Sequence, residues 1–275
     1  MTDRAMALAA VTATAGELAD CWEAVRDQSP LTQCLTNIVA APFVANVLLA
    51  AGASVAMVDN THEAEEFAGV AAGVAVNLGT PYDDTVTAMR AAVRGAAKAG
   101  TPWVLDPVGA GGLPWRTQVA RDLVGLAPPA VVRGNASEIL GLTGAGGGRG
   151  VDSTDAVEDA VTAARDLATE LGTTVAVSGP TDHLTDGQSL LRLAHGHPWM
   201  TRVTGMGCAL GALMAACTPV APSPLVGAAT ATAALTLAAE TAAESTAGPG
   251  TFAAALLDEL SLLAPTDLAA RVELR

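Results

Sequence analysis

The sequence predicts a single α/β domain over residues 1–275, in which helices cover both faces of a mostly parallel central sheet. Short apolar runs alternate with helical stretches between residues 54 and 178, as in successive βαβ units. The runs lack polar alternation, which is typical of parallel strands buried on both faces. The chain is 51% hydrophobic but only 3% aromatic, so small aliphatic side chains dominate and favour close packing of helices against a sheet.

The alternating region divides into strands of four or five residues and helices of eleven residues or more. The expected strands are Ser54–Val58, Val74–Leu78, Trp103–Asp106, Ala130–Arg133 and Thr174–Ser178. The expected helices are Ala40–Ala51, His62–Ala72, Asp83–Ala99, Arg116–Leu126 and Thr154–Leu171. Helices of this length provide the crossovers that parallel strands require.

The pattern changes after Ser178. Two short β-rich runs, Asp182–Thr185 and Ser189–Ala194, flank Asp186-Gly187, which indicates a hairpin. The remainder is expected to be helical, in the segments Cys208–Cys217, Pro224–Glu244 and Gly250–Leu263. Residues 1–28 are expected to form a helical N-terminal extension. Gly144–Gly150 lacks a following Lys-Ser/Thr and is interpreted as a loop rather than a phosphate-binding loop.

Charge restricts the classes of partner. Lys and Arg number 14 against 28 Asp and Glu, a formal net charge of −14, and no basic run exists to bind nucleic acid. The acidic surface also disfavours an anionic membrane, although a local group of backbone amides and one Arg still permits an anionic substrate. The longest apolar window, Gly227–Ala239, is shorter than the roughly 20 residues of a spanning helix.

Targeting and cysteine usage favour the cytoplasm. Residues 1–20 resemble a signal peptide weakly, because Asp3 interrupts the basic region and the apolar run has few large residues. The four cysteines, Cys21, Cys34, Cys208 and Cys217, have no metal-ligand spacing and are expected to be reduced thiols. We therefore expect a cytoplasmic protein with neither a membrane nor a nucleic-acid partner.

Polar residues follow the predicted strands at the ends where parallel sheets bind ligands. Asp106 ends one strand, Arg133 ends the next and Ser178 a third, while Thr36-Asn37 precede the first of the expected helices. If the topology holds, these residues gather at one edge of one sheet. An Arg at the end of a buried strand needs a charged partner, which a phosphate would supply.

Two interpretations of Asn135 and Glu138 remain open. Their spacing makes a capping box at the start of a helix. Alternatively, the carboxylates of Glu138 and Asp106 hold a hydrated Mg²⁺, which takes few protein ligands.

A second candidate feature is Gly205-Met206-Gly207-Cys208 at the start of a small-residue helix. Free backbone N–H groups and the positive end of the helix dipole make such a position an anion hole, or the segment is an ordinary turn. Cys208 could act as a weak base, as an orienting group or as a nucleophile. A nucleophile would need a histidine partner, and the candidates are His62, His183, His195 and His197.

At these residues the chain resembles the hydroxyethylthiazole kinases, a thiamine-salvage family of the ribokinase-like superfamily. The resemblance extends from Ser29 to Phe252 and rests on several motifs in the same order. The matching segments are Pro30-Leu31 with Thr36-Asn37; Ala45 to Ala50 with Gly52-Ala53-Ser54; Asn77-Leu78-Gly79-Thr80; Leu105-Asp106-Pro107-Val108; Arg133 to Ile139; Arg149-Gly150-Val151-Asp152; Thr204 to Gly211; and Gly248-Pro249-Gly250-Thr251-Phe252.

The resemblance implies a ribokinase-like fold, a homotrimer with sites between subunits, and phosphorylation of the alcohol of 4-methyl-5-(2-hydroxyethyl)thiazole by ATP with Mg²⁺. It implies roles for individual residues as well. These are Asn37, Val39, Met57 and Gly205 for the thiazole; Gly205, Met206, Gly207 and Cys208 for catalysis; Arg133, Asn135 and Ser178 for ATP; and Asp106 and Glu138 for the metal. Small aliphatic residues of the last helices are expected to cradle adenine.

The chain departs from the family at several positions. Gln33 stands where His is frequent, Pro42 and Val44 where Asn and Thr are usual, and Ser178 and Pro180 where Thr and Glu are usual. Alternatives therefore include another ribokinase-like small-alcohol kinase or an ATP-dependent dehydratase. A catalytically silent nucleotide-binding module and a cysteine hydrolase built on Cys208 are alternatives of a different kind.

Overall fold

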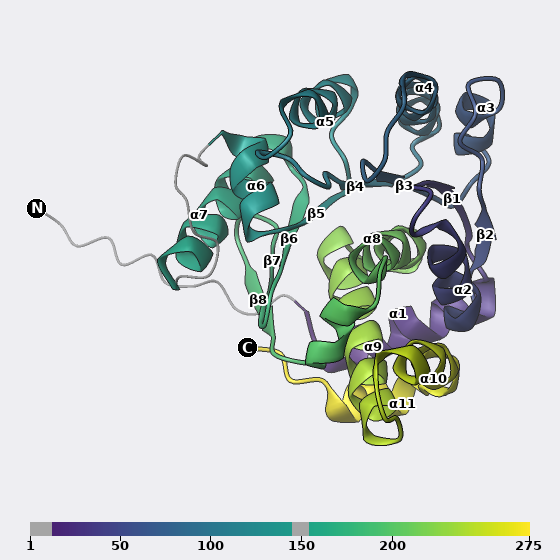
Figure 1. The fold of residues 1–275 in the computed structure, drawn as a ribbon, viewed down its shortest axis with the longest axis vertical. Coiled ribbons are helices and arrows are strands. Elements are labelled where there is room, and N and C mark those ends of the chain that lie inside the picture. Colours follow the sequence, from purple (N-terminus) through teal and green to yellow (C-terminus); the bar gives the residue numbers. More distant parts are fainter. Residues whose placement is uncertain (1–12, 145–153) are drawn as a thin grey trace, which may run out of the picture.

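A computed structural model describes residues 13–144 and 154–275 and contains one large sheet between two layers of helices (Figure 1). The strands of the described chain follow the order β2-β1-β3-β4-β5-β6-β7-β8. Their bounds are β1 Leu31–Leu35, β2 Ser54–Ala56, β3 Gly73–Asn77, β4 Trp103–Asp106, β5 Val131–Asn135, β6 Thr174–Ser178, β7 Asp182–Thr185 and β8 Leu190–Leu193. The first six strands are parallel, which confirms the predicted α/β class.

The hairpin predicted after Ser178 is present. β7 pairs antiparallel with β6 and with β8, and Gly187 at the turn has a φ of 91°, a conformation that glycine adopts without strain. The outer edge of β8 is covered, because the backbones of Arg192 and Arg275 exchange two hydrogen bonds. The C-terminal tail therefore protects this edge of the sheet.

One face of the sheet carries the helices from the middle of the sequence (Figure 1). They are α3 Ala64–Ala68, α4 Asp83–Ala99, α5 Pro114–Leu126, α6 Ala136–Thr143 and α7 Thr154–Leu171. Leu35, Val76 and Leu105 from the strands join this aliphatic core. Their sequence neighbours Cys34, Ala75 and Val104 point into the core on the other face, as the two-residue period of a strand requires.

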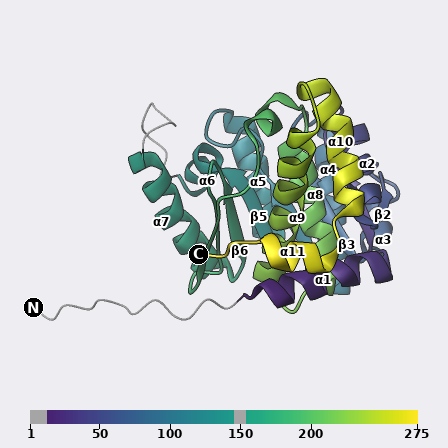
Figure 2. The ribbon, with the colours of Figure 1, turned by 90° about the horizontal axis from the view of Figure 1, so that it is seen from below.

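The other face packs against helices from both ends of the chain, which lie side by side in both views (Figures 1 and 2). They are α1 Ala15–Gln28, α2 Ala41–Ala51, α8 Met206–Cys217, α9 Pro224–Glu244, α10 Pro249–Leu262 and α11 Pro265–Arg271, with 3-10 turns at Pro198–Arg202 and Thr218–Val220. The small side chains of α8 and α9 are almost all buried. The expected helical extension is present from Ala15 onward and contributes Leu18 and Trp22 to this core.

Helix α9 is the one described helix long and apolar enough to cross a membrane by length and composition. The apolar window expected from the sequence, Gly227–Ala239, is shorter than the apolar part of this helix. However, 89% of the 18-residue test window is buried inside the protein, so packing in the core accounts for its apolar character.

The sequence analysis missed two elements, β1 and α11. Thr32 and Gln33 give β1 a polar appearance, yet both side chains are fully buried. Gln33 Nε2 donates to the carbonyls of Val58 and Ala64 at 2.8 and 3.2 Å, so both donors of the amide nitrogen have a partner inside the core. These two polar residues are the reason that the sequence pattern did not predict β1, an interior strand of the sheet.

Some predicted bounds were too long. Strand β2 ends at Ala56 rather than Val58 and is half-buried, because it lies at the sheet edge. Helix α3 covers Ala64–Ala68 within the predicted His62–Ala72, since a turn precedes it and another follows it. Of the predicted glycine loop, Gly144 ends α6 with a φ of 82°, and its other residues lie outside the described chain, as do the motif Arg149–Asp152 and residues 1–12.

Candidate functional site

Five polar side chains form a continuous row along the carboxyl ends of neighbouring parallel strands. They are Asn37 after β1, Asn77 on β3, Asp106 on β4, Arg133 on β5 and Ser178 on β6. Asn37 Nδ2 donates to Asn77 Oδ1 at 2.8 Å, and Asn77 Nδ2 donates to Asp106 Oδ2 at 2.8 Å. Arg133 then contacts both Asp106 and Ser178. The predicted gathering of polar residues at one sheet edge is present.

Asp106 is the buried charge at the centre of this row, with 2% of its surface exposed. Burial raises its pKa to about 7, the neighbouring Arg133 opposes the increase, and the charge of Glu138 adds to it. Asp106 Oδ1 is buried and has no hydrogen-bond partner among the residues that the structure describes. An unpaired buried carboxylate oxygen is costly, so this atom is available for a ligand.

Arg133 connects the row to the start of helix α8. Its Nε donates to Ser178 Oγ at 3.1 Å, and its Nη1 lies 3.5 Å from Asp106 Oδ2. The guanidinium also lies against Gly207, where an added Cβ would come within 2.5 Å of Nη1. The absence of a side chain at Gly207 therefore leaves the space that the arginine occupies.

The N-terminus of α8 faces the same edge of the sheet. Gly205 is the N-cap with a φ of 85°, and a Cβ there would lie 2.9 Å from Ala40 Cβ. Only glycine permits both the left-handed backbone and this close approach. No side chain of the described residues caps this helix end, so its first backbone N–H groups remain available to an anion.

Cys208 in the first turn of α8 receives a hydrogen bond from Asn37 Nδ2 at 3.3 Å. Burial raises the pKa of its thiol, and the charge of Asp106 adds to this effect. No histidine forms a hydrogen bond with Cys208 in the part of the chain that is described. The pair that a cysteine hydrolase needs is therefore not formed.

Asn135 and Glu138 form the predicted capping box at the start of α6. Glu138 Oε2 accepts from the Asn135 N–H at 2.9 Å, while Oε1 accepts from the Gly109 N–H at 3.0 Å. Glu138 thereby ties α6 to the loop that follows Asp106. Asn135 is exposed and does not line the large cavity described next.

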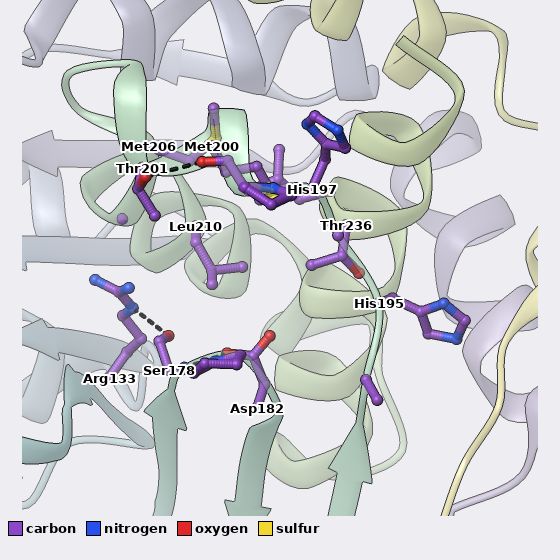
Figure 3. Close-up of a pocket in the computed structure, with 17 residues that line it drawn as sticks. Arg133, Ser178, Asp182, His195, His197, Met200, Thr201, Met206, Leu210 and Thr236 are labelled. Carbon is purple, nitrogen blue, oxygen red and sulfur yellow. Dashed lines mark hydrogen bonds between the residues drawn. The ribbon is translucent and has the colours of Figure 1, made fainter. Parts of the chain in front are cut away.

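A cavity of about 610 Å³ opens beside Arg133 and Ser178 (Figure 3). Its walls come from the turn after β6, the segment 194–201, α8 and α9. Leu210 and Leu235 give it an aliphatic side, and its volume suits a cofactor-sized ligand.

The sequence analysis missed several cavity residues, including Asp182, Met200 and Thr236. Asp182 is 8% exposed and accepts a hydrogen bond from the Gly179 N–H at 3.1 Å, and burial raises its pKa to about 6. Its position at the start of β7, directly after the turn at Ser178, was the available signal. Pro180, in place of the usual Glu, lies in the same cavity wall.

Val39 and Met57, predicted to bind the substrate, are not part of this cavity. Val39 is 58% exposed and Met57 39% exposed, on the side of the sheet edge near β1 and β2. Asn37 and Gly205 lie closer to the centre, next to Cys208 and Ala40. The predicted residues therefore lie in three places. Some belong to the buried polar row, some line the cavity on one side of it, and Val39 and Met57 are exposed on the other side.

A mostly parallel sheet of this topology, covered by helices on both faces, is the fold of ribokinase-like proteins. Solved structures support the fold. A ribokinase-like superfamily protein from Enterococcus faecalis V583 matches with a TM-score of 0.63 at 12% identity, covering 92% of this chain and 90% of that chain. The pyridoxal kinase from Staphylococcus aureus matches with a TM-score of 0.53 at 15% identity, covering 74% and 84%.

More similar proteins define the family. The model of the hydroxyethylthiazole kinase family matches residues 22–266. A hydroxyethylthiazole kinase of Cutibacterium acnes is 52% identical over 94% of this chain and 93% of its own length. The structure of the Pyrococcus horikoshii OT3 hydroxyethylthiazole kinase superposes with a TM-score of 0.87 at 34% identity, covering 94% of this chain and 98% of that one. The chain belongs to the hydroxyethylthiazole kinase family.

Proposed function

We propose that this kinase transfers the γ-phosphoryl group of ATP to the primary alcohol of 4-methyl-5-(2-hydroxyethyl)thiazole, the salvage reaction that supplies thiamine synthesis. One observation carries the proposal. The Arg133 guanidinium lies against the first turn of α8, between a nucleotide-sized cavity and the Asn37–Cys208 contact. Such a junction of positive charge and free amides is where phosphoryl transfer needs stabilisation.

On the nucleotide side, the 610 Å³ cavity would receive ATP. Arg133 would pair with a phosphate, because its guanidinium is held by Ser178 at the cavity wall and matches the geometry of phosphate oxygens. The Ser178 hydroxyl fixes the arginine, so a serine in place of the family's usual threonine preserves this role. Leu210 and Leu235 offer an apolar surface for the base.

The donor set at the centre fits Mg²⁺. Asp106 has a buried oxygen without a partner in the described parts of the chain, and Glu138 lies near enough for its charge to raise the pKa of Asp106. We assign the metal contacts to these two carboxylates, since Mg²⁺ keeps several waters and needs few protein ligands. When bound, Mg²⁺ would neutralise charge on the ATP phosphates. The protein itself holds Asp106 in place through Asn77 and Arg133.

On the acceptor side, Asn37 and Gly205 would bind the thiazole, and the alcohol would approach Cys208. The backbone N–H groups of Gly205 to Cys208 would stabilise the transferred group at the positive end of α8. The raised pKa of Cys208 keeps the thiol protonated, so little thiolate is present to act as a general base. We therefore assign it to orienting the alcohol or to accepting its proton late in the transfer.

Exposed apolar residues at and beside the predicted thiazole site support an oligomer. Ile38, Val39, Leu49 and Met57 are each at least 39% exposed, although they are large and apolar. A homotrimer in which a neighbouring subunit covers Val39 and Met57 would complete the thiazole site, and the expected compartment is the cytoplasm. Sedimentation should give three times the mass of 27.3 kDa; a monomer at micromolar concentration would contradict this assembly.

The function is tested by coupled ADP release with the thiazole alcohol in Mg-ATP, beside a panel containing pyridoxal and simple primary alcohols. We expect thiazole-dependent turnover at least a hundredfold above the other alcohols, and its loss in Arg133→Ala. Turnover of another alcohol at a higher kcat/KM would favour a different small-alcohol kinase. ATP binding without turnover of any alcohol would favour a silent nucleotide-binding module.

A further inference from the structure

The amide of Asn77 forms three hydrogen bonds at the last position of β3. The residue is 4% exposed and pairs in register with Asp106 on β4. Its Nδ2 donates to Asp106 Oδ2 at 2.8 Å. Its Oδ1 accepts from Asn37 Nδ2 at 2.8 Å and from the Gly79 N–H at 2.9 Å. One side chain thus connects the two strands that flank it.

Backbone N–H groups determine which atom donates and which accepts in each hydrogen bond that links Asn37, Asn77 and Asp106. The Gly79 N–H is only a donor, so Asn77 must present its oxygen there and its nitrogen to Asp106. Asn37 Oδ1 likewise accepts from the N–H groups of Val39 and Ala40, at 3.1 and 3.0 Å. Its nitrogen must then face Asn77 and the sulfur of Cys208.

We propose that Asn77 is a positioning residue that orients Asn37 and Asp106 together, and this inference rests on the proposed function. Asn37 belongs to the acceptor side of the reaction and Asp106 to the phosphate side. Both side chains take their orientation from the Asn77 amide. A shift of Asn77 would therefore displace Asn37 and Asp106 together. The phosphoryl acceptor and the phosphate groups are thereby held in register, and registration of this kind governs transfer rates.

The test compares Asn77→Ala with Leu123→Ala. Leu123 belongs to α5, is fully buried in the aliphatic core that α3 to α7 form with the sheet, and adds no polar group to the row. Its truncation therefore controls for lost stability alone. Two quantities are measured at a temperature where circular dichroism shows each variant folded. They are the Kd of the thiazole alcohol by calorimetry without nucleotide or metal, and kcat per folded protein.

We expect Asn77→Ala to raise the Kd at least threefold and to lower kcat at least tenfold, relative to Leu123→Ala. Asn77→Ser supplies one hydroxyl in place of the amide and should lie between the wild type and Asn77→Ala; it replaces Asn77→Ala if that protein does not fold. In an Asn37→Ala background, the same change should alter the Kd less than threefold, because the effect on binding passes through Asn37.

A smaller effect than threefold on the Kd or tenfold on kcat would overturn the positioning role and leave Asn77 a purely structural residue. A threefold or larger increase in the Kd that persists without the Asn37 amide would overturn the path through Asn37. Failure of the proposed function has a different signature, since the wild-type protein itself would then neither bind nor phosphorylate the thiazole alcohol.

Discussion

Replacing Gly207 by Ala should separate catalysis from stability. An added Cβ would lie 2.5 Å from Arg133 Nη1 and 2.9 Å from Nη2. The obstructing atoms are the end of a flexible side chain, so the guanidinium moves and the helix stays in place. The guanidinium must retreat by about 1 Å to reach an ordinary contact distance, which displaces it from its present position 3.5 Å from Asp106.

A misplacement of about 1 Å costs on the order of a hundredfold in rate, and losing a charge-assisted hydrogen bond costs about 1.5–3 kcal/mol. We therefore expect kcat/KM for ATP to fall by about 10- to 100-fold in Gly207→Ala, measured by coupled ADP release. Stability should hold or rise, because Ala exceeds Gly in helix propensity by up to about 1 kcal/mol. Thermal unfolding measures that second quantity.

The reasoning has two controls. Gly125 lies in α5 with no atom within 4 Å of an added Cβ, so Gly125→Ala should change stability in the same direction and leave activity unaltered. In an Arg133→Ala background, Gly207→Ala should cause no further loss of activity, since the displaced group is already gone. Activity of Gly207→Ala within threefold of the wild type would refute the proposed contact between Arg133 and a phosphate.

Three further outcomes follow from buried groups. Burial raises the pKa of Asp182 from 3.8 to about 6, so the folded state keeps a proton that the unfolded chain releases. Between about pH 4 and pH 7 the wild type should lose up to about 3 kcal/mol more stability than Asp182→Asn in urea unfolding; parallel pH profiles would contradict this. Gly79→Ala places a Cβ 2.4 Å from Asn37 Nδ2 and should raise the calorimetric Kd of the thiazole alcohol at least threefold, unlike Gly125→Ala. Gly141→Ala places a Cβ 2.4 Å from the Cα of Gly111 and, since backbone cannot yield as a side chain does, should lower the Tm by several degrees; an unchanged Tm would show that the loop shifts freely.

The parallel sheet was predictable because each of its buried strands, except β1, consists of an apolar run that ends in a polar residue. β1 was missed because Gln33 is polar in the sequence but finds two carbonyl partners only in the folded protein. Burial of a polar side chain depends on partners from distant segments, here Val58 and Ala64. Periodicity along one segment carries no information about such partners.

The candidate site divides in the same way. Asp106, Arg133 and Ser178 were predictable from their positions at strand ends, where a polar residue after an apolar run has no role in the core. Asn77 has the same signal, yet it appeared in the sequence only as part of a motif. Its importance comes from its register with Asp106, which pairing between strands alone determines. The residues that line the cavity come from five separate segments, so only the tertiary structure brings them together.

Glu138 shows why a capping motif and a metal carboxylate need not be alternatives. Its two oxygens accept from the N–H groups of Asn135 and Gly109, which accounts fully for its place at the start of α6. A carboxylate nevertheless has about four lone-pair sites, so two remain for a metal-bound water. The capping bonds fix the carboxylate beside Asp106 before any ligand arrives, and they fix the loop after β4 at the same time. The local stability of the helix start and the preorganisation of the charge are therefore achieved by the same two bonds.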